Sequence, residues 1–113
     1  MPQLVLFILD AELGKPAQGM DVSLYTVANS GDTKRLYEAG SGQDGCIRIE
    51  LPALTGAEKN RYKAVYRSER YFRRRERDTF YPQIEVDFCI GDNGGLVLPL
   101  LISPFAYTLY RGS

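Results

Sequence analysis

Few residues of this chain are suited to acid–base chemistry, because its 113 residues include no histidine. Imidazole titrates near neutrality and can therefore both take and give a proton in a reaction. The two cysteines, Cys46 and Cys89, lie far apart in the sequence and form no C-x-x-C pair. We therefore expect no disulfide scaffold and a reducing, cytoplasmic location. Neither a metal site nor a cofactor is expected.

The arginine-rich segment at residues 68–77, SERYFRRRER, is the other group of residues that invites a functional interpretation. Acidic residues interrupt it, and the whole chain balances 14 basic against 14 acidic side chains. Binding to nucleic acid or to an anionic membrane normally requires a positive excess. We interpret the segment as a short helix with a solvated charged face, with Ser68 as its N-cap and Tyr71 and Phe72 as its packing side. No nucleic-acid partner is expected.

The rest of the sequence predicts short strands separated by turns. Hydrophobic residues make up 44% and charged residues 25%, which is ordinary for a globular domain, and the length fits one domain over residues 1–113. The apolar run near the N-terminus is typical of a strand, not of a signal peptide, and no run is long enough to span a membrane. Residues 10–19 predict a loop and residues 92–95 a tight turn. Alternating or continuous apolar patterns predict strands at residues 4–9, 22–27, 36–39, 46–51, 62–66, 84–88, 96–102 and 105–110.

About eight strands and one short helix predict an all-β fold, a sandwich of two sheets. Three stretches of the chain resemble the transthyretin and 5-hydroxyisourate hydrolase family. They are residues 8–19, with ILD followed by GKPA and Gly19; residues 71–88, with YF, FYP and VDF; and residues 99–113, with PLLISPFAY and the final YRGS. The ending Tyr-Arg-Gly-Ser is typical of the hydrolase branch.

This resemblance implies two four-stranded sheets and a homotetramer, a dimer of dimers with a central channel. In the family, the channel holds either a hormone or a site that hydrolyses 5-hydroxyisourate during urate degradation. The resemblance implies that the hydrolase site contains two histidines, an arginine and the C-terminal tetrapeptide. Matched by position, the two histidines fall on Phe7 and Val97, and the arginine falls on Cys46. The C-terminal tetrapeptide is retained.

These differences predict a changed site. Phenyl and isopropyl groups neither take nor give protons, and a thiol does not replace a fixed cation that would hold an oxyanion. A polar substrate would leave its own groups unpaired there, at about 1–3 kcal/mol each. Hydrolysis of 5-hydroxyisourate is therefore unexpected, and a more apolar ligand is favoured. The predicted ligand-binding residues are Phe7, Leu9, Cys46, Val97, Pro99, Thr108 and Tyr110.

Four residues are candidates for catalysis, each with a structural alternative. Cys46 is a candidate nucleophile if Arg111 lowers its pKa, although a small apolar filler is the favoured interpretation. Tyr110 is a candidate proton donor or a packing residue. Arg111 binds a carboxylate or enolate, or forms an interface ion pair. Ser113 supplies a hydroxyl and the α-carboxylate, or is a frayed terminus.

Three functions remain open from the sequence. The first is a repurposed member of the family that binds or converts a small, largely apolar molecule in the channel, by cyclisation or isomerisation. The second is a non-catalytic binding protein that uses the channel as transthyretin does. The third is a 5-hydroxyisourate hydrolase of purine catabolism with an atypical site.

Overall fold

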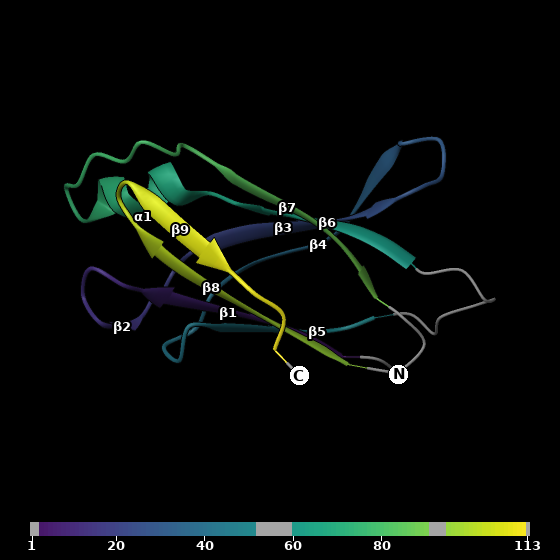
Figure 1. The fold of residues 1–113 in the computed structure, drawn as a ribbon, viewed down its shortest axis with the longest axis horizontal. Coiled ribbons are helices and arrows are strands. Elements are labelled where there is room, and N and C mark those ends of the chain that lie inside the picture. Colours follow the sequence, from purple (N-terminus) through teal and green to yellow (C-terminus); the bar gives the residue numbers. More distant parts are fainter. Residues whose placement is uncertain (1–2, 52–59, 91–94, 113) are drawn as a thin grey trace.

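The computed structural model describes residues 3–51, 60–90 and 95–112, and it shows two packed β-sheets with a helix at one end (Figure 1). The first sheet contains β1 (Gln3–Asp10), β2 (Lys15–Pro16), β5 (Cys46–Glu50), β8 (Leu96–Ser103) and β9 (Ala106–Leu109). The second sheet contains β3 (Asp21–Val27), β4 (Thr33–Gly40), β6 (Asn60–Tyr66) and β7 (Ile84–Ile90). The helix α1 (Ser68–Arg74) connects β6 to β7. The predicted all-β sandwich is confirmed.

Strand β1 is central in the first sheet. It pairs in parallel with β8 on one side and antiparallel with β5 and the short β2 on the other, while β9 pairs antiparallel with β8 at the edge. The second sheet is antiparallel throughout, in the order β4-β3-β6-β7. Because β1 and β8 are distant in sequence, their pairing brings the two ends of the chain into one sheet.

The core lies between the two sheets. Alternate residues of β1 and β8 face it, so each strand has one buried row and one outward row. The largest fully buried side chains include Tyr66 and Phe72, and among the described residues Tyr66 Oη is the one buried side-chain polar atom with no hydrogen-bond partner. The fully buried apolar side chains from the first sheet are Leu4, Leu6, Ile8, Leu100 and Ile102.

Two details differ from the sequence predictions. Residues 15–16, within the predicted loop 10–19, form β2 by pairing with the end of β1. The helix ends at Arg74, three residues before the predicted end, and the backbone turns at Glu76, where φ is 56°.

The predicted capping role of Ser68 is wrong. The N-cap residue is Arg67, and no side chain caps the helix. The hydroxyl of Ser68 is buried and donates to the carbonyl of Tyr81 at 2.6 Å, so it ties the helix to the following loop. The packing prediction is confirmed, because Tyr71 and Phe72 are both buried.

Two further sequence predictions have different outcomes. The turn at 92–95 falls largely on residues 92–94, which lie outside the described residues. Among the helices that are described, none has the length and apolar character needed to cross a membrane.

Candidate functional site

The outward face of the first sheet carries the predicted ligand-binding residues in adjacent rows. In the middle row, Phe7 of β1 lies opposite Cys46 of β5 on one side and Pro99 of β8 on the other. The row continues to Tyr110, whose N–H donates to the carbonyl of Pro99 at 3.3 Å. Four residues from different parts of the chain, three in strands and Tyr110 just after β9, therefore lie side by side across the sheet.

The rows on either side extend the same face. Val5 pairs with Val97, and Leu9 pairs with Leu101, which in turn pairs with Thr108 of β9. The apolar members of β1 on this face, Val5, Phe7 and Leu9, are half-buried in the single chain, whereas their neighbours on the inward face are fully buried. We call the surface formed by Val5, Phe7, Leu9, Cys46, Val97, Pro99, Leu101, Thr108 and Tyr110 the outer face.

The segment after β9 continues antiparallel along β8 at the edge of the first sheet. Gly112 forms an isolated bridge with Val97 and donates its N–H to the Val97 carbonyl at 2.7 Å. A Cβ at this glycine would lie 3.1 Å from the Cβ of Val97, so a side chain there would push the segment away from β8. Tyr110 and Arg111 are exposed, and Ser113 lies outside the described residues.

Cys46 begins β5 directly after a tight turn. Asp44 accepts a hydrogen bond from the N–H of Cys46 at 3.0 Å, and the thiol itself is half-buried. Burial raises the pKa of the Cys46 thiol, the negative charge of Asp44 raises it further, and Arg48 opposes both. Arg111 makes no contribution to this shift within the single chain. The thiol is therefore protonated at neutral pH, and a nucleophilic role for Cys46 stays a prediction.

Arg48 is a residue of this face that the sequence reasoning missed. It lies opposite Val5 in the register, two residues beyond Cys46, and so on the same side of β5. Its guanidinium is 3.0 Å from the Asp44 carboxylate, and both side chains are more than half exposed. The alternation in Cys46-Ile47-Arg48 was the available signal. Cys46 occupies the position that the resemblance matches to an arginine, but Arg48 places a cation in the adjacent row of the sheet.

Gly45 sets the turn that places Cys46. Its φ is 78°, and a Cβ there would lie 2.5 Å from the carbonyl oxygen of Ile8 and 2.9 Å from the Cβ of Pro16. That space is closed because Ile8 donates its N–H to the Gly45 carbonyl at 2.8 Å. Glycine is therefore required by both the backbone conformation and the close approach.

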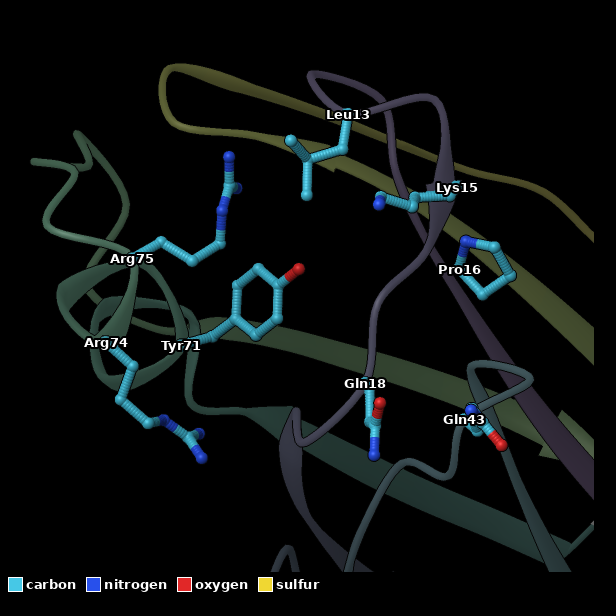
Figure 2. Close-up of a pocket in the computed structure, with 8 residues that line it drawn as sticks. All are labelled: Leu13, Lys15, Pro16, Gln18, Gln43, Tyr71, Arg74 and Arg75. Atoms are coloured by element: carbon cyan, nitrogen blue, oxygen red, sulfur yellow. The ribbon is translucent and has the colours of Figure 1, made fainter.

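A polar network lies at the C-terminal end of β1, around Asp10. The carboxylate of Asp10 is fully buried, and its Oδ1 accepts the N–H groups of Glu12 and Leu13, both at 3.0 Å. Its Oδ2 accepts the Tyr71 hydroxyl at 2.7 Å and the Arg75 guanidinium at 2.6 Å. Both oxygens are therefore satisfied by partners of this chain. Figure 2 shows Tyr71 and Arg75 side by side on the helix segment.

The network extends to the surface through Glu12. Its carboxylate accepts Arg75 at 2.8 Å and also pairs with Arg77. The hydrogen bond from Arg77 is the main cause that lowers the pKa of Glu12, with Arg75 adding to it. Burial, followed by the bond to Asp10, raises the pKa of Tyr71 to about 12. Asp10, Glu12 and Tyr71 are therefore all hydrogen-bonded within the network, and none of them is available as a general acid or base.

The prediction of a solvated arginine face is correct in part. Arg70, Arg73 and Arg74 are largely exposed, and they pair with Asp21 or Glu69. Arg75 is the exception, since its side chain is 23% exposed and reaches the buried Asp10. The sequence gives no sign of this contact because the two residues are 65 positions apart.

Within residues 3–51, 60–90 and 95–112, no three histidine, cysteine, aspartate or glutamate side chains come together as a metal-ligand set.

Comparisons with known proteins agree on one family. Residues 4–112 match the model of the HIUase/Transthyretin family. The 5-hydroxyisourate hydrolase of Salmonella dublin is 37% identical over 111 residues, which cover 97% of this chain and 80% of that protein. The solved structure of Klebsiella pneumoniae 5-hydroxyisourate hydrolase has a TM-score of 0.79 at 31% identity, covering 100% of this chain and 94% of that one.

The fold is also that of sea bream transthyretin in complex with thyroxine, with a TM-score of 0.82 over 96% of this chain and 93% of that one, at 24% identity. The family match spans both sheets and the helix, and the hydrolase relatives cover nearly the whole chain. This chain belongs to the HIUase/Transthyretin family.

Proposed function

We propose that this chain is a divergent member of its family whose outer face binds, and by cyclisation or isomerisation converts, a small, largely apolar molecule. The proposal places this molecule in a channel between subunits of a homotetramer, a dimer of dimers. The observation that carries it is the middle row of the sheet, in which Phe7 lies between Cys46 and Pro99, with Tyr110 beyond.

The side chains of this row offer a ligand a mainly apolar surface. Burying a side chain such as Phe or Val against a guest contributes about 1.5–3 kcal/mol. Polar ring atoms placed against the same groups would go unpaired, at about 1–3 kcal/mol each. The outer face therefore favours an apolar body by several kcal/mol over a ring rich in carbonyl and N–H groups.

A few polar groups at the rim supply orientation and any chemistry. Tyr110 is 56% exposed in the single chain, and its phenol, which makes no hydrogen bond to another described residue, would donate one to a guest. Arg48 is the cation in the adjoining row, where it would attract a negatively charged end of the molecule. A shape-matched pocket with such donors suits a rearrangement within one molecule, in which positioning supplies much of the rate enhancement.

Assembly follows from the exposure of the face. Apart from Pro99, which is buried, its apolar side chains on β1 and β8 are only half-buried in one chain, so a second copy and a guest would cover them. The thyroxine complex of sea bream transthyretin supports small-molecule binding by this fold. A carrier without turnover is the simpler form of the same proposal, and tight binding with no product would distinguish it.

Hydrolysis of 5-hydroxyisourate is the second candidate, favoured by the names of the relatives that are 31–37% identical. The retained Tyr110-Arg111-Gly112-Ser113 segment also favours it. Against it stands the complete absence of histidine, which removes about 10²–10⁴-fold of rate for each lost acid–base group.

The test of binding uses the fluorescent dye anilinonaphthalene sulfonate as an apolar probe, with the purified full-length chain. Phe7→Asn and Val97→Asn are expected to weaken binding about tenfold or more, equivalent to about 1.4 kcal/mol. Phe7→Leu, which keeps an apolar side chain, is expected to bind within about threefold of the parent chain.

Leu36→Asn on β4 is the matched control, because this exposed leucine belongs to the second sheet. Circular dichroism and thermal unfolding establish that each variant is folded. If Phe7→Asn and Val97→Asn are folded and both bind the dye as tightly as the parent chain, the proposed binding face is overturned.

A further inference from the structure

A second concave site lies away from the outer face, between α1 and the segment that contains β2. It is a cavity of about 440 Å³, a size within the range of small-molecule sites. Figure 2 shows Lys15 on β2 at one wall of the cavity and Arg74 and Arg75 at the wall formed by the helix. The ring of Tyr71 lies between the side chains of the two arginines. Its polar lining residues are Lys15, Gln18, Gln43, Tyr71, Arg74 and Arg75.

The charge of this lining is one-sided. It contains three cationic side chains, those of Lys15, Arg74 and Arg75, and no carboxylate among the described residues that line it. Lys15 takes part in no ion pair with any other described residue. Arg75 is paired with Asp10 and Glu12, and Arg74 with Asp21, so the excess of positive charge in the cavity is centred on the Lys15 ammonium group.

The two arginines are held from behind. Arg75 donates to Asp10 at 2.6 Å and to Glu12 at 2.8 Å, and Arg74 donates to the carbonyl of Gly19 at 2.6 Å. A guanidinium carries five N–H donors, so each retains donors for a ligand. Because their positions are already fixed, they lose little conformational freedom when an anion binds.

The amides give the cavity further specificity. Neither Gln18 nor Gln43 donates or accepts a side-chain hydrogen bond with the other described residues. Both border the cavity together with Lys15. Each amide therefore has a donor and an acceptor available for the middle part of a ligand whose two ends contact the cations.

We propose that this cavity is a binding site for a small organic dicarboxylate, with one carboxylate on Lys15 and the other on the arginines of the helix. Charged hydrogen bonds of this type are roughly twice as strong as neutral ones, and guanidinium groups match the two oxygens of a carboxylate. The bound molecule would bridge β2 and α1, so its binding would stabilise the fold. The site is independent of the proposed apolar ligand.

The test is isothermal titration calorimetry of the full-length chain with succinate and glutarate, with acetate and inorganic phosphate as comparison anions. The dicarboxylates are expected to bind at one site, at least tenfold more tightly than acetate. Raising the salt concentration from about 50 to about 300 mM is expected to weaken binding, because these charges are partly screened. Phosphate that binds more tightly than either dicarboxylate would overturn the assigned ligand class.

Variants locate the binding. Lys15→Ala is expected to lose at least tenfold in affinity, and Lys15→Arg is expected to retain most of it. Lys34→Ala on β4 is the control, since this exposed lysine lies on the second sheet. In amide-detected NMR, succinate is expected to shift the side-chain resonances of Gln18 and Gln43.

Equal losses in Lys15→Ala and Lys34→Ala would show diffuse attraction to the surface and overturn the site. Absence of saturable dicarboxylate binding would overturn it as well. Phe7→Asn is expected to leave succinate binding unchanged, so this result is separable from that of the outer face.

Discussion

Strand β1 serves two regions of opposite character. Along most of its length, its outward residues Val5, Phe7 and Leu9 lie on the outer face, where they are half-buried. At its end, Asp10 turns inward and is fully buried with both of its oxygens hydrogen-bonded. The polar groups that have all their partners within the chain stabilise the fold. The half-buried apolar groups of the outer face are the ones on which we propose that a ligand and a second subunit bind.

The hydrogen bonding of the Asp10 network explains why this polar cluster is not the proposed ligand site. Buried carboxylates are tolerated when every lone pair has a donor, and Asp10 meets that condition. Its partners come from the loop, from Tyr71 and from Arg75, so the network joins the helix to the first sheet. Substitutions in the Asp10 network should therefore lower the free energy of unfolding. Substitutions on the outer face should instead weaken ligand binding.

The largest effect is expected from Asp10→Ala. Removing one partner of a buried pair leaves Tyr71 without its acceptor and Arg75 with Glu12 alone, which costs about 3–5 kcal/mol. Unfolding in urea measures this change. Glu69→Ala is the control, because its pair with Arg73 is exposed and is worth about 0.5 kcal/mol.

If Asp10→Ala were no more destabilising than Glu69→Ala, the network would not have the structural role assigned to it. Asp10→Asn serves where the alanine variant does not fold, since it keeps the shape and part of the hydrogen bonding.

Gly45→Ala is expected to rank next. A non-glycine residue at this positive φ costs about 1–3 kcal/mol, and the added Cβ would also meet the carbonyl of Ile8. Gly31→Ala is the matched control, because Gly31 has a φ of 93° but nothing within 4 Å of an added Cβ. The difference between the two unfolding free energies measures the steric part. Equal losses would contradict the close approach of the turn to β1.

Tyr66→Phe is expected to stabilise the chain by about 1 kcal/mol, because it removes a buried hydroxyl that has no partner. This substitution contrasts with the Asp10 network, where every buried polar group has a partner. A loss of stability in Tyr66→Phe would show that the hydroxyl is satisfied after all, for instance by water.

The stability of the chain is expected to fall at alkaline pH. Burial raises the pKa of Tyr66, and it raises that of Tyr71 to about 12, whereas an unfolded tyrosine ionises near pH 10. The contribution is complete below pH 10 and is lost as pH rises towards the folded pKa, because the unfolded chain releases the protons first. Urea unfolding between about pH 8 and 11 measures the decline. Tyr66→Phe should reduce its slope, and an unchanged slope would contradict the assignment.

The smallest effect on stability is expected from Arg48→Ala, since the pair with Asp44 is exposed. Its effect should appear instead in binding, with about threefold weaker affinity for the sulfonate dye, whose charge Arg48 would attract. A large loss of stability together with unchanged dye affinity would place Arg48 with the structural region and not with the outer face.

The strand pattern was predictable because alternating apolar residues are a local signal. The segments around Cys46-Ile47-Arg48 and Ile84 to Phe88 became strands close to their predicted bounds. The two residues of β2 were missed because their strand character comes from pairing with Leu9 and Asp10, not from their own sequence. Ser68 was misjudged because the distant carbonyl of Tyr81 accepts its hydroxyl.

The site was predictable to a lesser extent. Residues of the outer face were named by resemblance, but their rows depend on the parallel register of β1 and β8, which no local pattern gives. Arg48 was not predicted because the resemblance assigns a cation only to the position of Cys46, two residues earlier on the same strand. The contact between Asp10 and Arg75 depends on how the helix docks, and so it required the structure.

The most direct test of the account is the decay of freshly generated 5-hydroxyisourate, followed by absorbance with and without purified protein. The account predicts the same rate in both, because the outer face offers no imidazole to move the proton of an attacking water. An acceleration that saturates with substrate and disappears in Tyr110→Phe or Arg111→Ala would contradict it.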